Sequence, residues 1–240
     1  MSDAILQVTG LTAGYSEEPI IHDMGLLAER GRITGIIGPN GCGKSTFLKA
    51  IVGIVKPTAG RVILDGADIT HLSPFRTLEK GLAYIPQGRQ VFPEMTVLEN
   101  LKMSAYTLRD AAVVQSRFEE AFARFPKLYE RRQQLAGTLS GGEQSMLSFA
   151  MAMVLQPTCM LLDEPTLGLA PTMIEQIFET IVEMNDQGIS MVIVEQNINV
   201  LFQVADYIYI LDSGRNRFDG LPQEVLRQEE LLKLYMGVQA

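Results

Sequence analysis

The segment Gly38 to Thr46 constrains the fold of this 240-residue chain more than any other. It lies between Arg32 to Ile37, an apolar run typical of a buried strand, and Lys44 to Gly53, where apolar residues recur at helical spacing. In such a strand, loop and helix, glycines let backbone N–H groups turn inward on the β- and γ-phosphates of a ligand, and the positive end of the helix faces the anion. Lys44 adds a positive charge, and the Ser45 hydroxyl can ligate Mg²⁺. The segment therefore predicts a nucleoside-triphosphate site formed by Gly38, Pro39, Asn40, Gly41, Cys42, Gly43, Lys44, Ser45 and Thr46.

Strand-like and helical patterns alternate along most of the chain, which predicts a mostly parallel sheet with helices on both faces. Other strands are expected at Ile5 to Val8, Ile20 to Ala28, Arg61 to Leu64, Ala83 to Gln87, Cys159 to Leu162, Ser190 to Val194 and, as the final strand, Tyr207 to Leu211. Asp65-Gly66 is a hairpin signal. Helical patterns cover Thr96 to Phe125, Ser140 to about Leu155, Thr172 to Asp186 and the acidic tail Pro222 to Met236. We expect a single domain over residues 1–240, with a helical subdomain inserted at about residues 91–156.

Composition argues against several classes of protein. The net charge of −8 and the pI near 4.9 do not suit a general nucleic-acid binder, because affinity for a phosphate backbone comes from clustered Lys and Arg. The start Met1-Ser-Asp lacks the pattern of a secretory signal, and no apolar run approaches the ~20 residues that span a bilayer. The two cysteines, Cys42 and Cys159, are poorly placed for a bridge and suit a reducing compartment. These features predict a soluble cytoplasmic protein; at a membrane, other chains must supply the membrane part.

A second candidate element is the apolar strand Cys159 to Leu162, which ends in Asp163 and Glu164. Ligands of open α/β sheets lie beyond the carboxyl ends of strands, so both carboxylates are expected near the bound nucleotide. Asp163 is placed to hold Mg²⁺ through water, and Glu164 to polarise the water that attacks the γ-phosphorus. Alone, this pair could equally be two solvated acids at a strand end.

A third element is Leu139-Ser-Gly-Gly-Glu-Gln144, which precedes an apolar helix. Ser140 and Glu143 fit a capping box, in which the hydroxyl caps the backbone and the glutamate reaches back. Gly141 and Gly142 leave the helix N-terminus bare of side chains, as an approaching phosphate requires. Capping and anion binding can share this turn.

Together these elements resemble the ATP-binding subunits of ABC transporters over nearly the whole chain. The phosphate loop, Gln87, the Ser140-to-Gln144 signature and the Asp163-Glu164 strand have the order and spacing of that family. The resemblance implies an α/β P-loop core with an N-terminal antiparallel β subdomain and an inserted helical subdomain. It also implies ATP hydrolysis with Mg²⁺ in a head-to-tail pair of chains, identical or different. Each ATP would lie between the phosphate loop of one chain and Ser140, Gly141, Gly142 and Glu143 of the other.

Three further positions match the family's functional residues. Tyr15 resembles the aromatic residue that stacks on adenine, although alone it could be a tyrosine packed on the sheet. Gln87 resembles the glutamine whose side-chain oxygen reaches Mg²⁺ and the attacking water. Gln196 stands where the family usually has a histidine that contacts the γ-phosphate; its amide can donate a hydrogen bond but cannot act as an acid. The predicted catalytic set is Glu164, Gln196, Gln87 and Lys44, and the predicted metal set is Ser45, Gln87 and Asp163.

The departures from the general family pattern resemble one subgroup. Val194-Glu-Gln-Asn197, Leu167-Gly-Leu-Ala-Pro171 with Ala170 in place of the usual Asp, and Gly88 to Leu101 are similar to the ATPases of branched-chain amino acid importers, often called LivF-like, and of the related urea or amide importers. That resemblance implies permease subunits, a substrate-binding protein and a peripheral position on the inner face of the membrane. Met151 and Gln156 stand where relatives commonly carry arginine. The loss of these charges could change the rate of ATP turnover and its coupling to transport.

Two other functions remain open from the sequence. A soluble ABC-type ATPase serving cluster assembly, repair or translation would share the same nucleotide site. A P-loop kinase would share the phosphate loop but leaves the Ser140 signature unexplained. The cargo cannot be read from the chain, because specificity in such systems belongs to other subunits.

Overall fold

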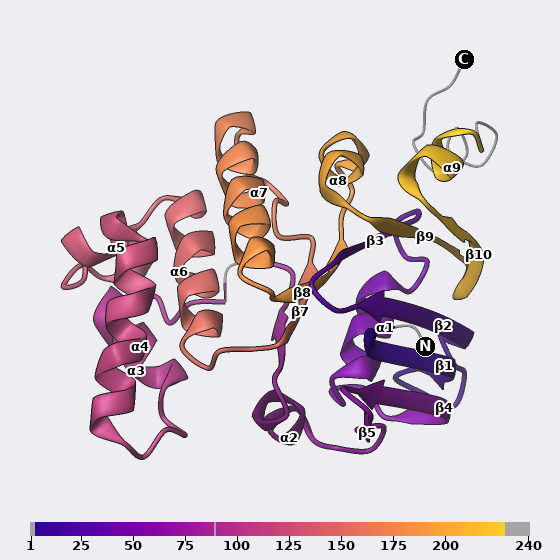
Figure 1. Ribbon diagram of the computed structural model, residues 1–240, viewed down its shortest axis with the longest axis horizontal. Helices are drawn as coiled ribbons and strands as arrows, with labels where there is room; N and C mark the ends of the chain where they lie inside the picture. The colour runs from indigo at the N-terminus through magenta and orange to yellow at the C-terminus, as the bar shows by residue number, and fades with distance from the viewer. Residues whose placement is uncertain (1–2, 89, 229–240) are drawn as a thin grey trace.

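The computed structural model describes residues 3–88 and 90–228. Its N-terminal part is an antiparallel sheet of four strands in the order β2-β1-β4-β5 (Figure 1). The strands are β1 (Ala4–Ala13), β2 (Ile21–Glu29), β4 (Pro57–Leu64) and β5 (Ala67–Asp68). β4 and β5 pair across Asp65-Gly66, so the predicted hairpin is confirmed.

A second sheet has six strands in the order β10-β9-β3-β8-β7-β6. These strands are β3 (Ile33–Ile37), β6 (Leu82–Ile85), β7 (Cys159–Asp163), β8 (Ser190–Val194), β9 (Tyr207–Asp212) and β10 (Arg215–Gly220). All neighbours are parallel except β9 and β10. Every residue of β3, β7 and β8 is buried, which explains why the sequence reads as unbroken apolar runs there.

Successive residues of the central strands face two different hydrophobic clusters. Leu162 and Ile193 belong to the cluster shared with the helices, while Leu161 and Val192 belong to the one shared with the antiparallel sheet. Side chains of a strand alternate between faces, so one strand serves both clusters. This packing holds the carboxyl ends of β3, β7 and β8 at one edge of the sheet.

The helices form two groups (Figure 1). Those that follow strands of the six-stranded sheet are α1 (Lys44–Ile51), α7 (Pro171–Asp186) and α8 (Ile198–Val204). A second group lies to one side, at the left of Figure 1: α3 (Val97–Ser104), α4 (Ala111–Arg124), α5 (Pro126–Glu130) and α6 (Gly141–Met153). These four fall within the predicted helical insertion, whose limits as a subdomain remain a prediction. Among the described residues there are also two short helices, α2 (Pro74–Glu79) and α9 (Pro222–Leu226), and a 3₁₀ turn at Ala136–Thr138.

Some sequence-based expectations are wrong in detail. The strand predicted at Tyr207 to Leu211 is present as β9 but is not the final one, because β10 follows it. The segment Arg215–Gly220 is polar and half exposed, and it is a strand only through its pairing with β9. The helical stretch from Thr96 is interrupted at residues 105–110, where Asp110 caps the start of α4 through Ala112 N. The tail helix predicted over Pro222 to Met236 begins at Pro222 but ends at Leu226, as α9; the part of the prediction beyond residue 228 lies outside the described residues.

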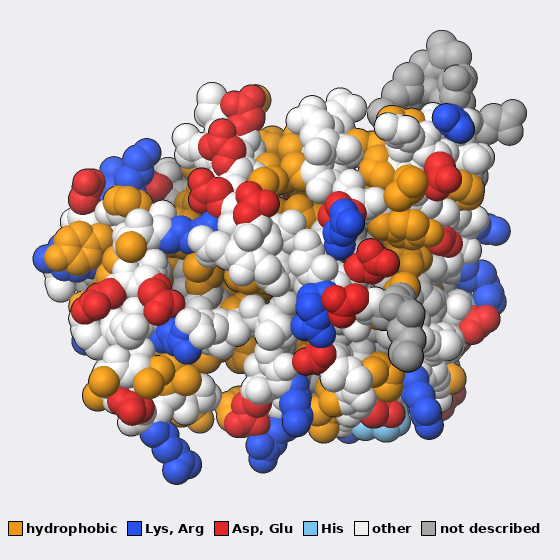
Figure 2. Space-filling view, in the orientation of Figure 1, with side chains coloured by type: hydrophobic (Ala, Val, Ile, Leu, Met, Phe, Trp, Pro, Cys, Tyr) orange, Lys and Arg blue, Asp and Glu red, His pale blue; other side chains and the backbone are white. Residues whose placement is uncertain are grey.

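The surface carries both signs of charge. Figure 2 shows basic and acidic side chains interspersed on one face, with acidic ones gathered over α7. Among the residues described, no helix combines the length and apolarity needed to cross a membrane.

Candidate active site

The phosphate loop joins β3 to α1. Gly43, the N-cap residue of α1, has φ 105°, in the left-handed region that favours glycine. Lys44 is buried, and its Nζ donates to the carbonyl oxygens of Gly38 at 2.8 Å and Pro39 at 3.1 Å. The loop therefore curls around its own lysine, and the first N–H groups of an eight-residue helix lie beside that charge.

Asp163 ends β7 and is 1 % exposed. Its Oδ1 accepts a hydrogen bond from Ser45 Oγ at 3.0 Å, and its Oδ2 accepts one from Tyr84 Oη at 3.0 Å. Burial raises the pKa of Asp163, while the two hydroxyl donors oppose that shift. A buried carboxylate of this kind favours any arrangement that brings a cation to it.

The Ser45 and Asp163 pair fits Mg²⁺ in the manner of phosphate-transfer sites. No group of three or more His, Cys, Asp or Glu side chains that could cage a metal occurs among the described residues. Mg²⁺ in such sites needs fewer protein ligands, because one or two oxygens suffice when phosphates and waters complete the octahedron. A hydroxyl and a carboxylate in contact, next to the phosphate loop, are a donor set of that type.

Glu164 follows directly and is also buried, at 6 % exposed. Its backbone has φ 50°, so the chain turns sharply after β7. Gln87, two residues beyond β6, donates from Nε2 to Glu164 Oε2 at 2.8 Å. This contact uses the amide nitrogen of Gln87 and leaves its side-chain oxygen as the group that could face a metal or water.

Gln196 lies two residues beyond the end of β8 and is exposed. The residue before it, Glu195, is buried and accepts hydrogen bonds from the backbone N–H of Gln196 at 3.1 Å and of Asn197 at 3.3 Å. The other oxygen of Glu195 accepts from Thr166 N at 3.0 Å and Thr166 Oγ1 at 2.7 Å. Burial raises the pKa of Glu195, and these donors oppose it.

Tyr15 is 61 % exposed on the turn between β1 and β2. The end of that turn is near the phosphate loop, because a Cβ added at Gly43 would lie 2.8 Å from Ile21 Cγ2. Cys42 is buried and burial raises its pKa, which suits a small residue that fills a loop position. Cys42 and Cys159 are both free thiols, as expected.

The Ser140 turn begins α6 and forms the predicted capping box. Ser140 Oγ accepts from Glu143 N at 3.4 Å, and Glu143 Oε2 accepts from Ser140 N at 2.9 Å. Gly142 is less bare than expected: it is buried, and a Cβ there would overlap the side chain of Met173 on α7. α6 lies close to α7 here, and a side chain at this position would require the end of Met173 to move. In Figure 1, α6 lies at the left and α1 at the right of the molecule, so the Ser140 turn and the phosphate loop are far apart in space within one chain.

The two positions that depart from the arginine pattern lie outside this site. Met151 is half-buried and lines a groove of about 300 Å³ with Tyr84, Pro86 and Met103. Gln156 donates from Nε2 to Glu120 at 3.2 Å.

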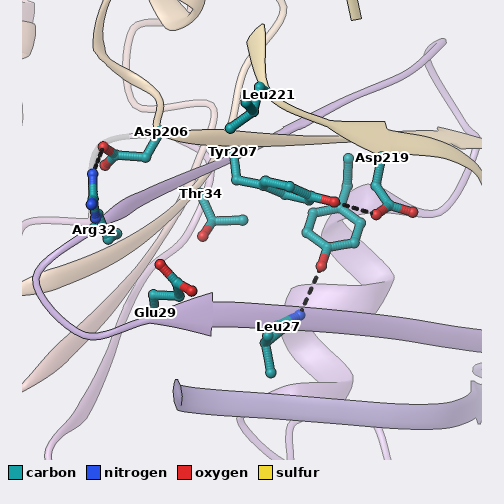
Figure 3. Close-up of a pocket in the computed structure, with 9 residues that line it drawn as sticks. Leu27, Glu29, Arg32, Thr34, Asp206, Tyr207, Asp219 and Leu221 are labelled. Carbon is teal, nitrogen blue, oxygen red and sulfur yellow. Dashed lines mark hydrogen bonds and ion pairs between the residues drawn. The ribbon is translucent and has the colours of Figure 1, made fainter. Parts of the chain in front are cut away.

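A separate cleft of about 530 Å³ lies at the opposite end of β3, between β2 and β9 (Figure 3). Its polar groups mostly bind one another: Arg32 pairs with Asp206 at 2.6 Å and Tyr207 Oη donates to Asp219 at 2.6 Å. None of the predicted site residues lines it. Because ligands of such sheets lie at the carboxyl ends of strands, this cleft is a junction between the two sheets and not the nucleotide site.

Sequence reasoning missed Tyr84, Thr166 and Glu195. Glu195 carries a signal that could have been used, since it is an acid directly after a buried strand, like Asp163 and Glu164. Tyr84 carries none, because only the pairing of β6 with β7 brings its hydroxyl to Asp163.

Comparisons with known proteins agree with this geometry. The profile of the family described as ABC transporter matches residues 21–167. A probable branched-chain amino acid transport ATP-binding protein of Archaeoglobus fulgidus, LivF, is 41 % identical over 98 % of this chain and 99 % of its own. The high-affinity branched-chain amino acid transport ATP-binding protein BraG of Pseudomonas aeruginosa is 37 % identical over 93 % and 95 %. The lipopolysaccharide export ATP-binding protein LptB of Haemophilus influenzae is 31 % identical over 98 % of both chains.

Solved structures agree in fold. A nucleotide-free ATP-binding cassette from an ABC transporter superposes with a TM-score of 0.87 at 27 % identity, over 98 % of this chain and 100 % of the other. An ATP-binding cassette in its ADP conformation superposes with a TM-score of 0.89 at 27 % identity, over 98 % and 99 %.

Proposed function

This chain belongs to the ABC transporter family, and from that premise we propose that it is the ATP-hydrolysing subunit of an importer for branched-chain amino acids. The proposal that the transported substrate is a branched-chain amino acid is based on the 41 % identity to LivF over nearly the full length of both proteins. The observation that carries the chemistry is the contact of Ser45 with Asp163 beside the contact of Gln87 with Glu164.

The residues divide the chemistry between them. The loop from Gly38 to Thr46 binds the phosphates of ATP, and Lys44 turns from its loop carbonyls to the β- and γ-phosphates. Ser45, Asp163 and Gln87 would hold Mg²⁺, and that ion would supply positive charge to neutralise the phosphate oxygens. Glu164 orients the attacking water and Gln196 donates to the γ-phosphate. Tyr15 supports the adenine by stacking.

The site is completed by a second chain, identical or related. Ser140 and Gly142 contact the γ-phosphate that is held by Lys44 of that partner, and Gly141 and Glu143 complete the same turn. The separation of α6 from α1 within one molecule supports this arrangement, because the signature cannot serve its own phosphate loop. At the start of α6 Ser140 is exposed and Gly141 carries no side chain, which suits an anion that arrives from outside.

The membrane partner is a pair of permease subunits, fed by a substrate-binding protein, with this chain on the inner face of the membrane. The groove beside Met151 supports docking of a short permease helix, since Phe75, Met103 and Tyr106 are exposed apolar side chains along it. The groove also includes Tyr84, which touches Asp163, so a bound helix is linked to the metal-binding side chain.

Hydrolysis is tested with Glu164→Gln in the full-length chain. ATP binding should persist while turnover falls by about 10²- to 10⁴-fold, because the side chain that orients the water no longer accepts its proton. Glu119→Gln, at an exposed acid on α4, is the matched control and should keep wild-type turnover. Undiminished turnover in the Glu164 variant would show that another group orients the water.

The transport assignment is tested by affinity purification from membranes. A multispan protein should co-purify, and cells that lack the chain should lose uptake of labelled leucine but keep uptake of urea. Loss of urea uptake instead would favour an amide importer, and a stable complex without membrane proteins would favour a soluble ABC-type ATPase. Phosphoryl transfer to an acceptor other than water would favour a kinase.

A further inference from the structure

Glu195 is a buried carboxylate to which the chemistry above gives no role. It is 3 % exposed and follows the last residue of β8. Each of its oxygens accepts two hydrogen bonds, one pair from Thr166 and one pair from the backbone N–H groups of Gln196 and Asn197. All four distances lie between 2.7 and 3.3 Å. The side chain is thus saturated by donors from two separate segments.

The two segments are the loops that carry Glu164 and Gln196. Thr166 lies in the tight turn after Glu164, where Leu167 N donates to Glu164 O at 3.1 Å. On the other side, Gln196 and Asn197 lead into α8. The backbone of Glu195 is also anchored, because its N–H donates to Ile36 O of β3, two residues before the phosphate loop, at 3.3 Å. One residue therefore contacts three elements that converge on the phosphate site.

Only a carboxylate suits this position. An ionised Glu is an acceptor at both oxygens and can take four hydrogen bonds, whereas the Gln amide has one accepting oxygen and a donating NH₂ group. After the substitution Glu195→Gln, the NH₂ group would face either Thr166 or the N–H groups of Gln196 and Asn197. With the NH₂ group toward Gln196 and Asn197, both backbone N–H groups would lose their acceptor. With it toward Thr166, the buried Thr166 N–H would lose its acceptor and the hydroxyl would have to turn to accept instead of donate.

We propose that Glu195 is a positioning residue that holds the loop of Glu164 and the turn of Gln196 in a fixed relation, so that both side chains meet the same γ-phosphate. The proposal rests on the proposed function, because it concerns the geometry of hydrolysis at that site. Glu195 touches neither phosphate nor water; it acts through Thr166 on one side and the Gln196 backbone on the other. Loosening it separates two groups that must act on one reacting centre.

The test compares kcat and KM for ATP in the full-length chain with those of Glu195→Gln. We expect KM within about twofold of wild type, because the phosphate loop is untouched, and a fall in kcat on the order of 10- to 100-fold, the effect of misplacing a group by about 1 Å. A purely structural role would lower the unfolding temperature and leave kcat per folded molecule unchanged. That result would overturn the proposal.

Additivity gives a second, independent readout. If Glu195 acts by placing Gln196, then Gln196→Ala should lower kcat in the wild-type background and add little to Glu195→Gln. Full additivity of the two effects would contradict the proposal.

A milder variant keeps the proposal testable if Glu195→Gln does not fold. Thr166→Val removes one of the four hydrogen bonds and should lower kcat less than Glu195→Gln does, again without raising KM. Its control is Thr77→Val on α2, where the buried hydroxyl bonds only to carbonyls of Val52 and Pro74. Equal kcat in these two threonine variants would count against the positioning role. If the wild-type chain hydrolyses no ATP either alone or with the related chain that pairs with it, the proposed function fails; if it does hydrolyse ATP and Glu195→Gln matches it, only the present inference fails.

Discussion

Replacing Ser140 by alanine separates the two roles that its turn can have. Ser140 caps α6, with Oγ donating to Glu143 Oε2 at 2.8 Å and accepting from Glu143 N at 3.4 Å. The chain contains a second capping box with nearly the same geometry at the start of α3. There Thr96 Oγ1 donates to Glu99 Oε2 at 2.8 Å and accepts from Glu99 N at 3.2 Å. Thr96→Ala is therefore a matched control that lacks any proposed contact with phosphate.

Loss of the helix cap and loss of the phosphate contact differ in free-energy cost and in the measurement that detects them. Loss of either cap should cost about 1 kcal/mol of stability. For a chain of this size that corresponds to a drop in unfolding temperature of about 2–4 °C. The longer cap distance at Ser140 predicts that its drop is no larger than that of Thr96. A hydrogen bond to a charged phosphate adds about 1.5–3 kcal/mol, felt only in the paired, ATP-bound state. That energy corresponds to a loss in hydrolysis of about 10- to 150-fold.

The assay combines thermal unfolding of the free chain with ATP hydrolysis at chain concentrations high enough for pairing. Both variants should unfold a few degrees below wild type, and only Ser140→Ala should lose hydrolysis. Equal hydrolysis in the two variants would refute the phosphate contact and leave Ser140 as a helix cap alone.

Two further predictions concern Tyr84, which contacts Asp163, and Glu143, which contacts Ser140. Tyr84→Phe removes one of the two hydroxyl donors of Asp163, and the loss of a charge-assisted hydrogen bond should weaken Mg²⁺-dependent ATP binding by about tenfold or more; an affinity titration with and without Mg²⁺ checks this, and an unchanged difference would contradict it. Burial raises the pKa of Glu143, but hydrogen bonds from Ser140 and the positive charges of Arg131 and Lys127 together outweigh it, so the pKa in the folded state lies below the ordinary value for a glutamate. Ionised Glu143 therefore contributes stability that is present above the unfolded-state pKa and lost as pH falls through the folded-state pKa. Glu143→Gln should unfold below wild type at pH 7, with the gap closing on acidification; a gap independent of pH in thermal scans would count against the reasoning.

Contiguous motifs were predictable because their physics is local. The phosphate loop needs only a strand, glycines and a helix start in sequence, and in the structure Gly38 to Thr46 runs from the end of β3 into the first turn of α1. The capping box at Ser140 is likewise a property of four successive residues. The carboxylates Asp163 and Glu164 lie at the expected carboxyl end of β7, where the apolar run Cys159 to Leu162 stops.

Weak local patterns were not sufficient. The polar strand β10 forms by pairing with the edge of β9, and the residues Arg215 to Gly220 themselves have no alternating apolar pattern that predicts a strand. Gly142 has the sequence pattern of a bare turn residue, yet in the structure Met173, thirty-one positions later, packs against it. At Gly142 a residue distant along the chain decides the outcome, whereas β10 depends on β9, its neighbour in a hairpin across Ser213-Gly214.

The same division holds for the site. Order along the chain is enough to specify a triphosphate loop, an acidic strand end and a capped helix, because each is built from neighbours in sequence. The fold adds the contacts that join them: Tyr84 with Asp163, Gln87 with Glu164, and Glu195 with Thr166. These pairs are separated by 29 to 79 residues and meet only where parallel strands bring their carboxyl ends to one edge. Hydrogen bonds are short-ranged, so which side chains share them is settled by strand order and packing and not by distance along the chain.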